Sequence, residues 1–149
     1  MIALIQRVAT ARVTVKDNQI AKIGKGFLIL LGVITGDHDT DLDYLVKKIT
    51  KLRIMSDEAG KMNLDLAASG GSVLVVSQFT LAGDVSGGNR PSFIKAAEPA
   101  VAEKYYHQFV AGLRAANLTV KTGNFGDYMQ VDLTNDGPTT IIIDSKMRK

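Results

Sequence analysis

The chain has no cysteine and no tryptophan, and its 149 residues include only two histidines and three prolines. Without cysteine there can be no disulfide, no thiolate metal ligand and no cysteine nucleophile, which suits a reducing compartment. No apolar run approaches the roughly 20 residues that span a bilayer, and Arg7 comes too early for a signal-peptide core. We therefore expect a cytoplasmic protein with no membrane partner.

The two histidines offer little for metal or base chemistry. His38 stands between Asp37 and Asp39, where capping and solvation explain the cluster, and His107 falls within an expected helix with no other ligand beside it. We expect neither a metal nor another cofactor.

The overall composition is that of a globular protein, with 46% hydrophobic and 22% charged residues. The length favours a single domain over residues 1–149. The net charge is +3, and four cations, Lys47, Lys48, Lys51 and Arg53, cluster within seven residues. Charge alone favours a solvated helix face for this cluster over a nucleic-acid patch.

The hydrophobic periodicity predicts a mixed α+β fold. Strand-like runs come first, with a two-residue turn at Asp17-Asn18, and a helical period follows over 42–52, opened by Thr40 and Asp43. A strand over 73–76 and a second helix from Pro99 come next. Three further strands are expected, over 118–121, 128–133 and 139–144. The predicted order is βββαβαβββ, with a strongly curved, barrel-like sheet and two main helices.

Two polar clusters stand at the ends of strand-like runs, where a scaffold can present backbone groups to a ligand. One is Ser77 to Leu81, and the other runs from Asn135 to Thr140. Neither contains a nucleophile with its base, so the residues alone favour strand-end hydrogen bonding for Ser77 and Thr80. By the same standard Gly137-Pro138 is ordinary turn material.

Together, three motifs resemble those of the D-aminoacyl-tRNA deacylases. They are Ser77-Gln78-Phe79-Thr80-Leu81 after an apolar strand, Arg90-Pro91-Ser92-Phe93 downstream, and N-x-G-P-x-T from Asn135 to Thr140. The similarity covers nearly the whole chain. It implies a cytoplasmic homodimer, with active sites at the subunit interface, that hydrolyses the ester joining a D-amino acid, or glycine, to the tRNA 3′-adenosine.

The resemblance also implies roles for particular residues. The catalytic segment would be Ser77, Gln78, Phe79 and Thr80, lining the pocket for the adenosine and the aminoacyl group. Gly137 and Pro138, as a cis peptide from the partner subunit, would fix the amino group and block an L side chain. The other residues implied are Phe125 and Met129 near the pocket, Arg7, Asn135 and Thr140 in support, and Arg90 as a tRNA contact.

This chemistry needs little side-chain machinery. An aminoacyl ester is already activated, and the neighbouring ribose 2′-OH can assist the attacking water. The protein then supplies position and backbone donors, such as the N–H groups around Phe79 and Thr80. Two other functions stay open: a dimer that binds the tRNA acceptor end without cleaving it, and a small-metabolite esterase or deaminase-like enzyme using the same intersubunit cleft.

Overall fold

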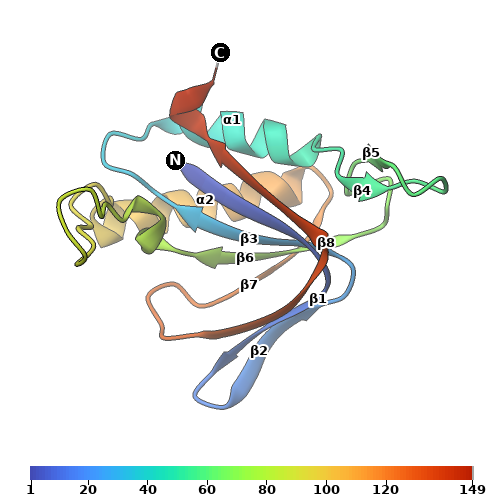
Figure 1. Cartoon of the computed structure of the whole chain (residues 1–149), viewed down its shortest axis with the longest axis horizontal. Helices are drawn as coiled ribbons and strands as arrows, with labels where there is room; N and C mark the ends of the chain where they lie inside the picture. Colours follow the sequence, from blue (N-terminus) through green and yellow to red (C-terminus); the bar gives the residue numbers. More distant parts are fainter. Residues whose placement is uncertain (149) are drawn as a thin grey trace.

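The computed structural model describes residues 1–148 and consists of a six-stranded sheet, a two-stranded sheet and two main helices (Figure 1). The strands are β1 (Ile2–Val15), β2 (Asn18–Ile23), β3 (Gly26–Gly32), β4 (Met55–Ser56), β5 (Met62–Leu64), β6 (Ser72–Ser77), β7 (Thr119–Thr122) and β8 (Gln130–Asp144). The helices are α1 (Asp39–Thr50) and α2 (Pro99–Ala115), with short 3-10 turns η1 (Phe79–Ala82) and η2 (Ser145–Met147).

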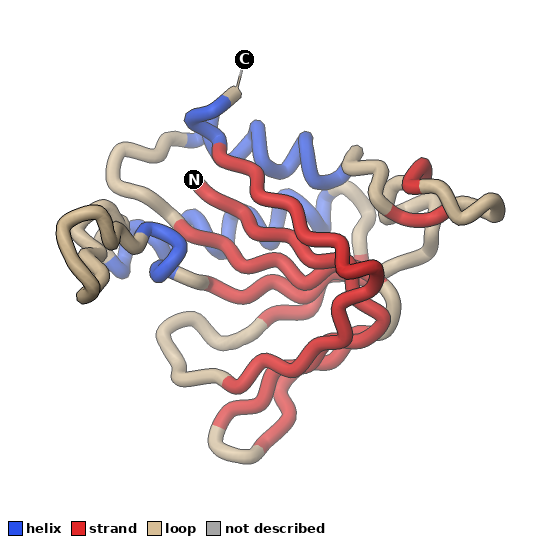
Figure 2. The backbone as a smooth tube through the Cα atoms, in the orientation of Figure 1, coloured by secondary structure: helices blue, strands red, loops and turns tan. Residues whose placement is uncertain are grey.

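The long strand β1 organises the sheet. One edge of β1 pairs with β3 along its first half and with β2 along its second half, while β8 runs antiparallel along the other edge. The sheet continues from β3 through the parallel strands β6 and β7. Because β1 and β8 bend together, the lower half of the sheet curls over the upper half (Figure 2).

Apolar side chains alternate between the two faces of this sheet, as the period of a strand requires. Ala3, Ile5 and Ile29 belong to the larger core, which the buried faces of α1 and α2 complete. Leu28 and Leu74 point the other way, into a smaller core closed by the curled half of the sheet. The predicted mixed α+β class with a barrel-like sheet is therefore confirmed.

The strand count differs from the prediction in two places. The runs expected as separate strands over 128–133 and 139–144 form one strand, β8, because both pair with β1 and only a bulge between Asn135 and Thr140 interrupts the ladder. The stretch between the first predicted helix and the predicted strand over 73–76, for which no strand was predicted, contributes β5 to a small hairpin with β4.

The first hairpin turn and the start of the first helix both differ from their predicted positions. The first hairpin turns at Lys16 and Asp17, which have φ of 47° and 64°, and not at Asp17-Asn18. Helix α1 begins two residues earlier than predicted: its N-cap is His38, whose N–H donates to Asp41 Oδ2 at 2.9 Å, in place of the predicted Thr40 and Asp43 pair. In the described part of the chain, no helix is both long and apolar enough to cross a bilayer.

Candidate active site

Strand β6 leads directly into the predicted catalytic segment. The Gln78 N–H donates to the Leu31 carbonyl at 2.8 Å, which extends the pairing of β6 with β3 by one residue. The chain then turns into η1, and Leu81 packs over Gly32. A Cβ on Gly32 would lie 3.0 Å from Leu81 Cβ and 3.1 Å from the Gln78 carbonyl oxygen. The bare backbone of Gly32 thus lets η1 close against the end of β3.

A cavity of about 490 Å³ opens beside this segment. It brings together five of the predicted residues: Ser77, Gln78, Phe79, Phe125 and Met129. Sequence reasoning missed the remaining walls, which include Val33, Val76, Ala96, Ala97, Pro99, Ala102, Asp127, Tyr128 and Val131. Most of these are small or apolar side chains that carry no chemical signal. Only Tyr128, 91% exposed and next to Met129, stands out for its exposure.

Behind the cavity, Tyr106 of α2 supports the wall. Its hydroxyl donates to the Val75 carbonyl at 2.9 Å, and its ring lies 5.9 Å from that of Phe125. Burial raises the pKa of Tyr106 to about 12, so this hydroxyl remains a neutral donor at physiological pH. The tyrosine therefore ties β6 to α2 and supports Phe125 from behind.

At the cavity rim, η1 presents two backbone donors. Its internal hydrogen bonds begin with the Leu81 N–H, which donates to the Gln78 carbonyl at 3.3 Å. The N–H groups of Phe79 and Thr80 precede that first turn, and in such a turn the leading N–H groups have no internal acceptor. Phe79 is 54% exposed, and its ring packs edge-on against that of Phe93, with 5.1 Å between the ring centres. Thr80 is exposed and is not part of the cavity wall.

The cavity wall holds few ionisable groups. The ionisable side chains in the wall are those of Asp127 and Tyr128, and Asp127 accepts a hydrogen bond from Asn124 Nδ2 at 2.9 Å. Among the residues that the structure describes, no histidine or lysine lines the cavity, and no group of three potential metal ligands occurs. The Ser77 hydroxyl thus shares the cavity with one carboxylate, that of Asp127, and with no histidine or lysine of residues 1–148.

The second predicted cluster forms the bulge of β8. Asn135 Nδ2 bridges the bulge by donating to the Arg7 carbonyl at 2.9 Å and to the Thr139 carbonyl at 3.0 Å, while Thr140 Oγ1 donates to Asn135 Oδ1 at 3.4 Å. The Gly137–Pro138 peptide is cis, and Gly137 has φ of +125°. A Cβ there would lie 2.6 Å from Thr139 Oγ1, so only glycine fits.

Arg7 connects this bulge to the β4 region. Its buried guanidinium donates to the carbonyls of Asp136, at 3.2 Å, and Ile54, at 2.8 Å, and to Ser56 Oγ at 3.3 Å. The Asp136 carboxylate also pairs with Arg7 Nε at 3.1 Å. The side chain of Arg7 therefore fixes the bulge from beneath. The anchors at Ile54 and Ser56 had no signal in the sequence.

The cavity and the bulge lie level with opposite ends of β3. Arg7 is level with Phe27 at the start of β3, whereas Ser77 is level with Leu31 near its end. Four residues of strand correspond to about 13 Å along the chain, and three strand spacings from β8 to β6 add about 14 Å across. Gly137, Pro138, Arg7, Asn135 and Thr140 are therefore not part of the cavity of their own chain.

The loop between η1 and α2 holds the last predicted residue, Arg90, which is exposed. The loop is closed on itself by a backbone pair between Asp84 and Ser92, both bonds being 2.8 Å. Lys95 adds an ion pair to Asp84 at 2.8 Å. Arg90 thus lies outside the cavity, at the tip of an ordered loop.

Comparison with known proteins is consistent over the full length. The sequence model of the family described as D-Tyr-tRNA(Tyr) deacylase matches residues 4–144. The chain is 51% identical over 148 residues to the D-aminoacyl-tRNA deacylase of Lacticaseibacillus casei, covering 99% of this chain and 100% of that one. It is 55% identical over 141 residues to the same-named protein of Variovorax paradoxus, covering 95% and 97%.

Two solved structures share the fold. A c-Myc DNA unwinding element binding protein superposes with a TM-score of 0.91 at 42% identity, covering 97% of this chain and 98% of that one. A probable eukaryotic D-amino acid tRNA deacylase superposes with a TM-score of 0.83 at 16% identity, covering 95% and 97%, which speaks for the fold alone.

Proposed function

The chain belongs to the D-Tyr-tRNA(Tyr) deacylase family, and from that membership we propose how its residues hydrolyse a D-aminoacyl-tRNA. The enzyme is a carboxylic-ester hydrolase of translation quality control: it separates a D-amino acid from tRNA. We assign this work to the cytoplasm.

The 3′-terminal aminoacyl-adenosine occupies the cavity beside η1. Phe79, Phe125 and Met129 supply its apolar walls, and Ser77 and Gln78 supply polar contacts at the end of β6. The ester carbonyl lies at the rim, where the N–H groups of Phe79 and Thr80 receive the negative charge that develops on its oxygen. Preorganised donors of this kind account for a large part of the catalysis in acyl transfer.

The attacking water is activated by the substrate itself. No histidine or lysine from residues 1–148 lines the cavity, and the carboxylate that does, Asp127, already accepts a hydrogen bond from Asn124. The ribose 2′-OH lies beside the ester in every aminoacyl-tRNA and can orient the water or polarise the carbonyl. The protein then contributes position and electrostatics, which can together remove several kcal/mol of the barrier.

Selection against L-amino acids comes from the partner subunit. In a homodimer the bulge at Gly137 and Pro138 reaches the neighbouring cavity, where its carbonyls hold the amino group. An L side chain would collide with that backbone, so the wrong enantiomer is rejected by a clash. Glycine has no side chain to collide, and we expect glycyl-tRNA to be hydrolysed as well.

The shape of the chain supports this assembly. Ile142, Leu4 and Leu30 are direct neighbours across β8, β1 and β3, on the sheet face away from the helices, and Ile142 is 67% exposed. The same face continues through Val76 into the cavity. A two-fold axis that runs along this strip, across the strands, would reverse the strand direction and so bring the bulge of each subunit toward the cavity end of its partner.

The observation that carries the proposal is the pair of backbone donors at the rim of a cavity that no histidine or lysine of residues 1–148 lines. Its test is incubation of the protein with matched D- and L-aminoacyl-tRNA of one tRNA. We expect rapid release of the D-amino acid and little release of the L form. Tight binding of the acceptor end without release would favour a binding dimer. Equal rates for both enantiomers, or cleavage of simple esters only, would favour a general esterase.

A further inference from the structure

A second groove, of about 480 Å³, lies at the C-terminal end of α1. It is lined by Tyr44, Lys47, Lys48, Lys51, Leu52 and Arg53. All four cations are exposed, whereas Tyr44 and Leu52 are half-buried. The groove therefore combines an apolar floor with a positively charged rim.

The cations of this groove are not neutralised. None of the four forms an ion pair with a carboxylate of residues 1–148. The Arg53 guanidinium is held by Asn63, donating from Nε to its carbonyl at 2.6 Å and from a terminal nitrogen to its side-chain oxygen, and it keeps its charge. Lys48 Nζ lies 5.9 Å from the centre of the Tyr44 ring.

A favourable interaction with the dipole of α1 accounts for only two of the four cations in the groove. Lys47 and Lys48 belong to the last turn of α1, where cations favour the helix dipole. Lys51 and Arg53 lie beyond Thr50, where the helix has ended. Their gathering with the first pair around an aromatic ring matches a polyanion with unpaired bases, because stacking and phosphate contacts are how proteins hold single-stranded nucleic acid.

The groove adjoins the bulge of its own chain. Arg53 directly precedes Ile54 in the chain. The guanidinium of Arg7 donates to the Ile54 carbonyl and also to the Asp136 carbonyl, next to Gly137. In Figure 1 the end of α1 and the β4–β5 hairpin lie on the side of the molecule where β8 bends. If the bulge enters the partner's cavity, the groove of one subunit borders the active site of the other.

We propose that this groove binds the sugar–phosphate backbone of the tRNA acceptor arm whose 3′ end occupies the partner's cavity. The inference rests on the proposed function, which supplies both the substrate and the crossed arrangement of subunits. Tyr44 stacks on a base, and the lysines and Arg53 neutralise successive phosphates. Each subunit thus contributes two features to the active site of its partner: the bulge, which selects the amino acid, and the groove, which binds the tRNA.

The test compares two substrates and two sets of variants. The triple variant Lys47→Gln, Lys48→Gln, Lys51→Gln is assayed on a D-aminoacyl-tRNA and on the corresponding 3′-D-aminoacyl-adenosine. The control variant Lys22→Gln, Lys25→Gln, Lys121→Gln removes the same charge from exposed positions elsewhere. We expect the groove variant to lose about tenfold or more in kcat/KM on tRNA, with the log–log salt slope reduced by about 2 to 3. Its rate on the adenosine ester stays unchanged.

Three outcomes would overturn the assignment or its premise. An equal loss of kcat/KM in the control variant would mean that only the net charge of the protein matters. An unaltered salt slope would mean that the three lysines do not contact phosphates. Failure of the unmodified enzyme on both substrates would instead overturn the proposed function, which the variants do not address.

Mixed dimers test the crossed arrangement directly. Ser77→Trp fills the cavity of the chain that carries it, so only the other chain's cavity can react. When the groove variant and Ser77→Trp are on different chains, the open cavity faces an intact partner groove, and we expect full activity per open site. When both are on one chain, the open cavity faces the altered groove, and activity on tRNA falls. The reverse pattern would mean that the groove binds the tRNA whose 3′ end occupies the cavity of the same chain.

Discussion

Thr80 offers a bound ester two different groups, its hydroxyl and its backbone N–H. The hydroxyl belongs to an exposed side chain outside the cavity wall, and no histidine or lysine among the lining residues is there to activate it. The N–H stands before the first hydrogen-bonded turn of η1 and is free to meet an oxyanion. The two groups can be removed separately, which makes their contributions measurable.

We expect Thr80→Ala to retain most of the activity on D-aminoacyl-tRNA, within about threefold, because it keeps the N–H. Replacement of the residue by its α-hydroxy acid deletes only that N–H, and kcat is expected to fall by about 10² to 10³, as for loss of one oxyanion donor. Single-turnover deacylation rates check both. Complete inactivity of Thr80→Ala with an unchanged unfolding temperature would instead make the hydroxyl the nucleophile.

At this scale the sequence predicted the residues that carry a chemical signature. Ser77, Gln78, Phe79, Phe125 and Met129 do meet at one cavity. Ala96 and Ala97 could not be predicted, since a small apolar wall has no pattern of its own. Ile54 and Ser56 were missed because Arg7 reaches them through space, by contacts that depend on the tertiary fold.

The position of η1 depends on how closely it approaches β3. A methyl group on Gly32 would press against Leu81 and the Gln78 carbonyl, at 3.0 and 3.1 Å. We expect Gly32→Ala to shift η1 by a few tenths of an ångström and to lower kcat/KM by about tenfold, since small displacements of positioning groups are costly. Gly24→Ala is the matched control, because a Cβ there meets nothing within 4 Å.

Thermal unfolding distinguishes displacement of η1 from general damage. If Gly32→Ala and Gly24→Ala have similar kcat/KM values, η1 does not depend on this contact. If Gly32→Ala loses activity only in proportion to the fraction unfolded, the effect is one of stability.

Elements with an uninterrupted period were predictable, and those defined by pairing were not. The alternation in β1 and the helical spacing in α1 both correspond to observed elements. Strand β8 was divided in two because Asn135 to Thr140 read as turn residues, although β1 holds both halves in one ladder. The α1 cap lies two residues earlier than predicted because the His38 N–H donates to Asp41, a carboxylate whose burial depends on the tertiary fold.

Assembly of the whole molecule is expected to depend on the strip formed by Leu4, Leu30 and Ile142. Ile142→Lys places a charge on this open face, which opposes its burial against a second copy. We expect the variant to elute as a monomer and to lose deacylase activity, because each cavity then lacks the partner's bulge. Val101→Lys, at a position 46% exposed on α2, is the control and should change neither. A fully active Ile142→Lys dimer would place the interface elsewhere.

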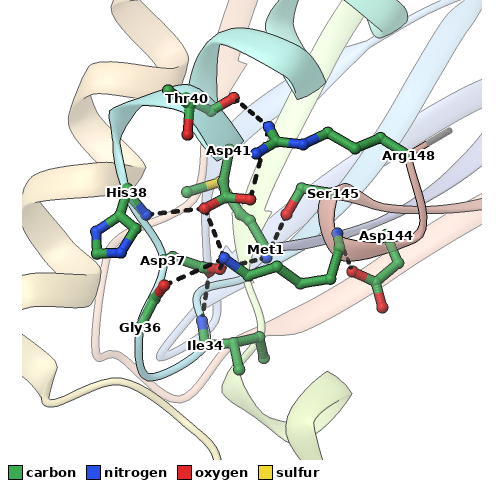
Figure 3. Close-up of polar contacts among 11 residues, drawn as sticks. Met1, Ile34, Gly36, Asp37, His38, Thr40, Asp41, Asp144, Ser145 and Arg148 are labelled. Atoms are coloured by element: carbon green, nitrogen blue, oxygen red, sulfur yellow. Dashed lines mark hydrogen bonds and ion pairs between the residues drawn. The ribbon is translucent and has the colours of Figure 1, made fainter.

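The two ends of the described chain are joined by a buried ionic cluster beside α1 (Figure 3). The Met1 amino group pairs with Asp37 Oδ1 at 2.6 Å and donates to Ser145 Oγ at 2.8 Å. Lys146 then bridges Asp37 and Asp41, at 3.4 and 2.7 Å. Strand β1, helix α1 and the segment after β8 are thus connected through two carboxylates that are each 1% exposed.

Asp41 should make this junction sensitive to acid. Burial by itself would raise the pKa of Asp41, but Lys146 and the His38 N–H together hold it well below its usual range. A carboxyl whose pKa is lowered on folding stabilises the native state fully above its unfolded pKa of about 3.9. That contribution is lost as the pH falls below this value, by up to about 1.4 kcal/mol per pH unit.

We therefore expect Asp41→Asn to be less stable than the natural chain at pH 7, by about 1.5 to 3 kcal/mol, the range for hydrogen bonds to a charged group. This difference in the free energy of unfolding should narrow as the pH falls from 4 toward 2.5, because the natural chain then loses the stabilisation by the charged Asp41 carboxylate, which the variant lacks at every pH. Urea unfolding across this range measures it, with Asp43→Asn as the control: an exposed carboxylate of the same helix that forms no ion pair within residues 1–148. A difference between Asp41→Asn and the natural chain that stays constant with pH would mean that the cap geometry, and not the charge of Asp41, stabilises the junction.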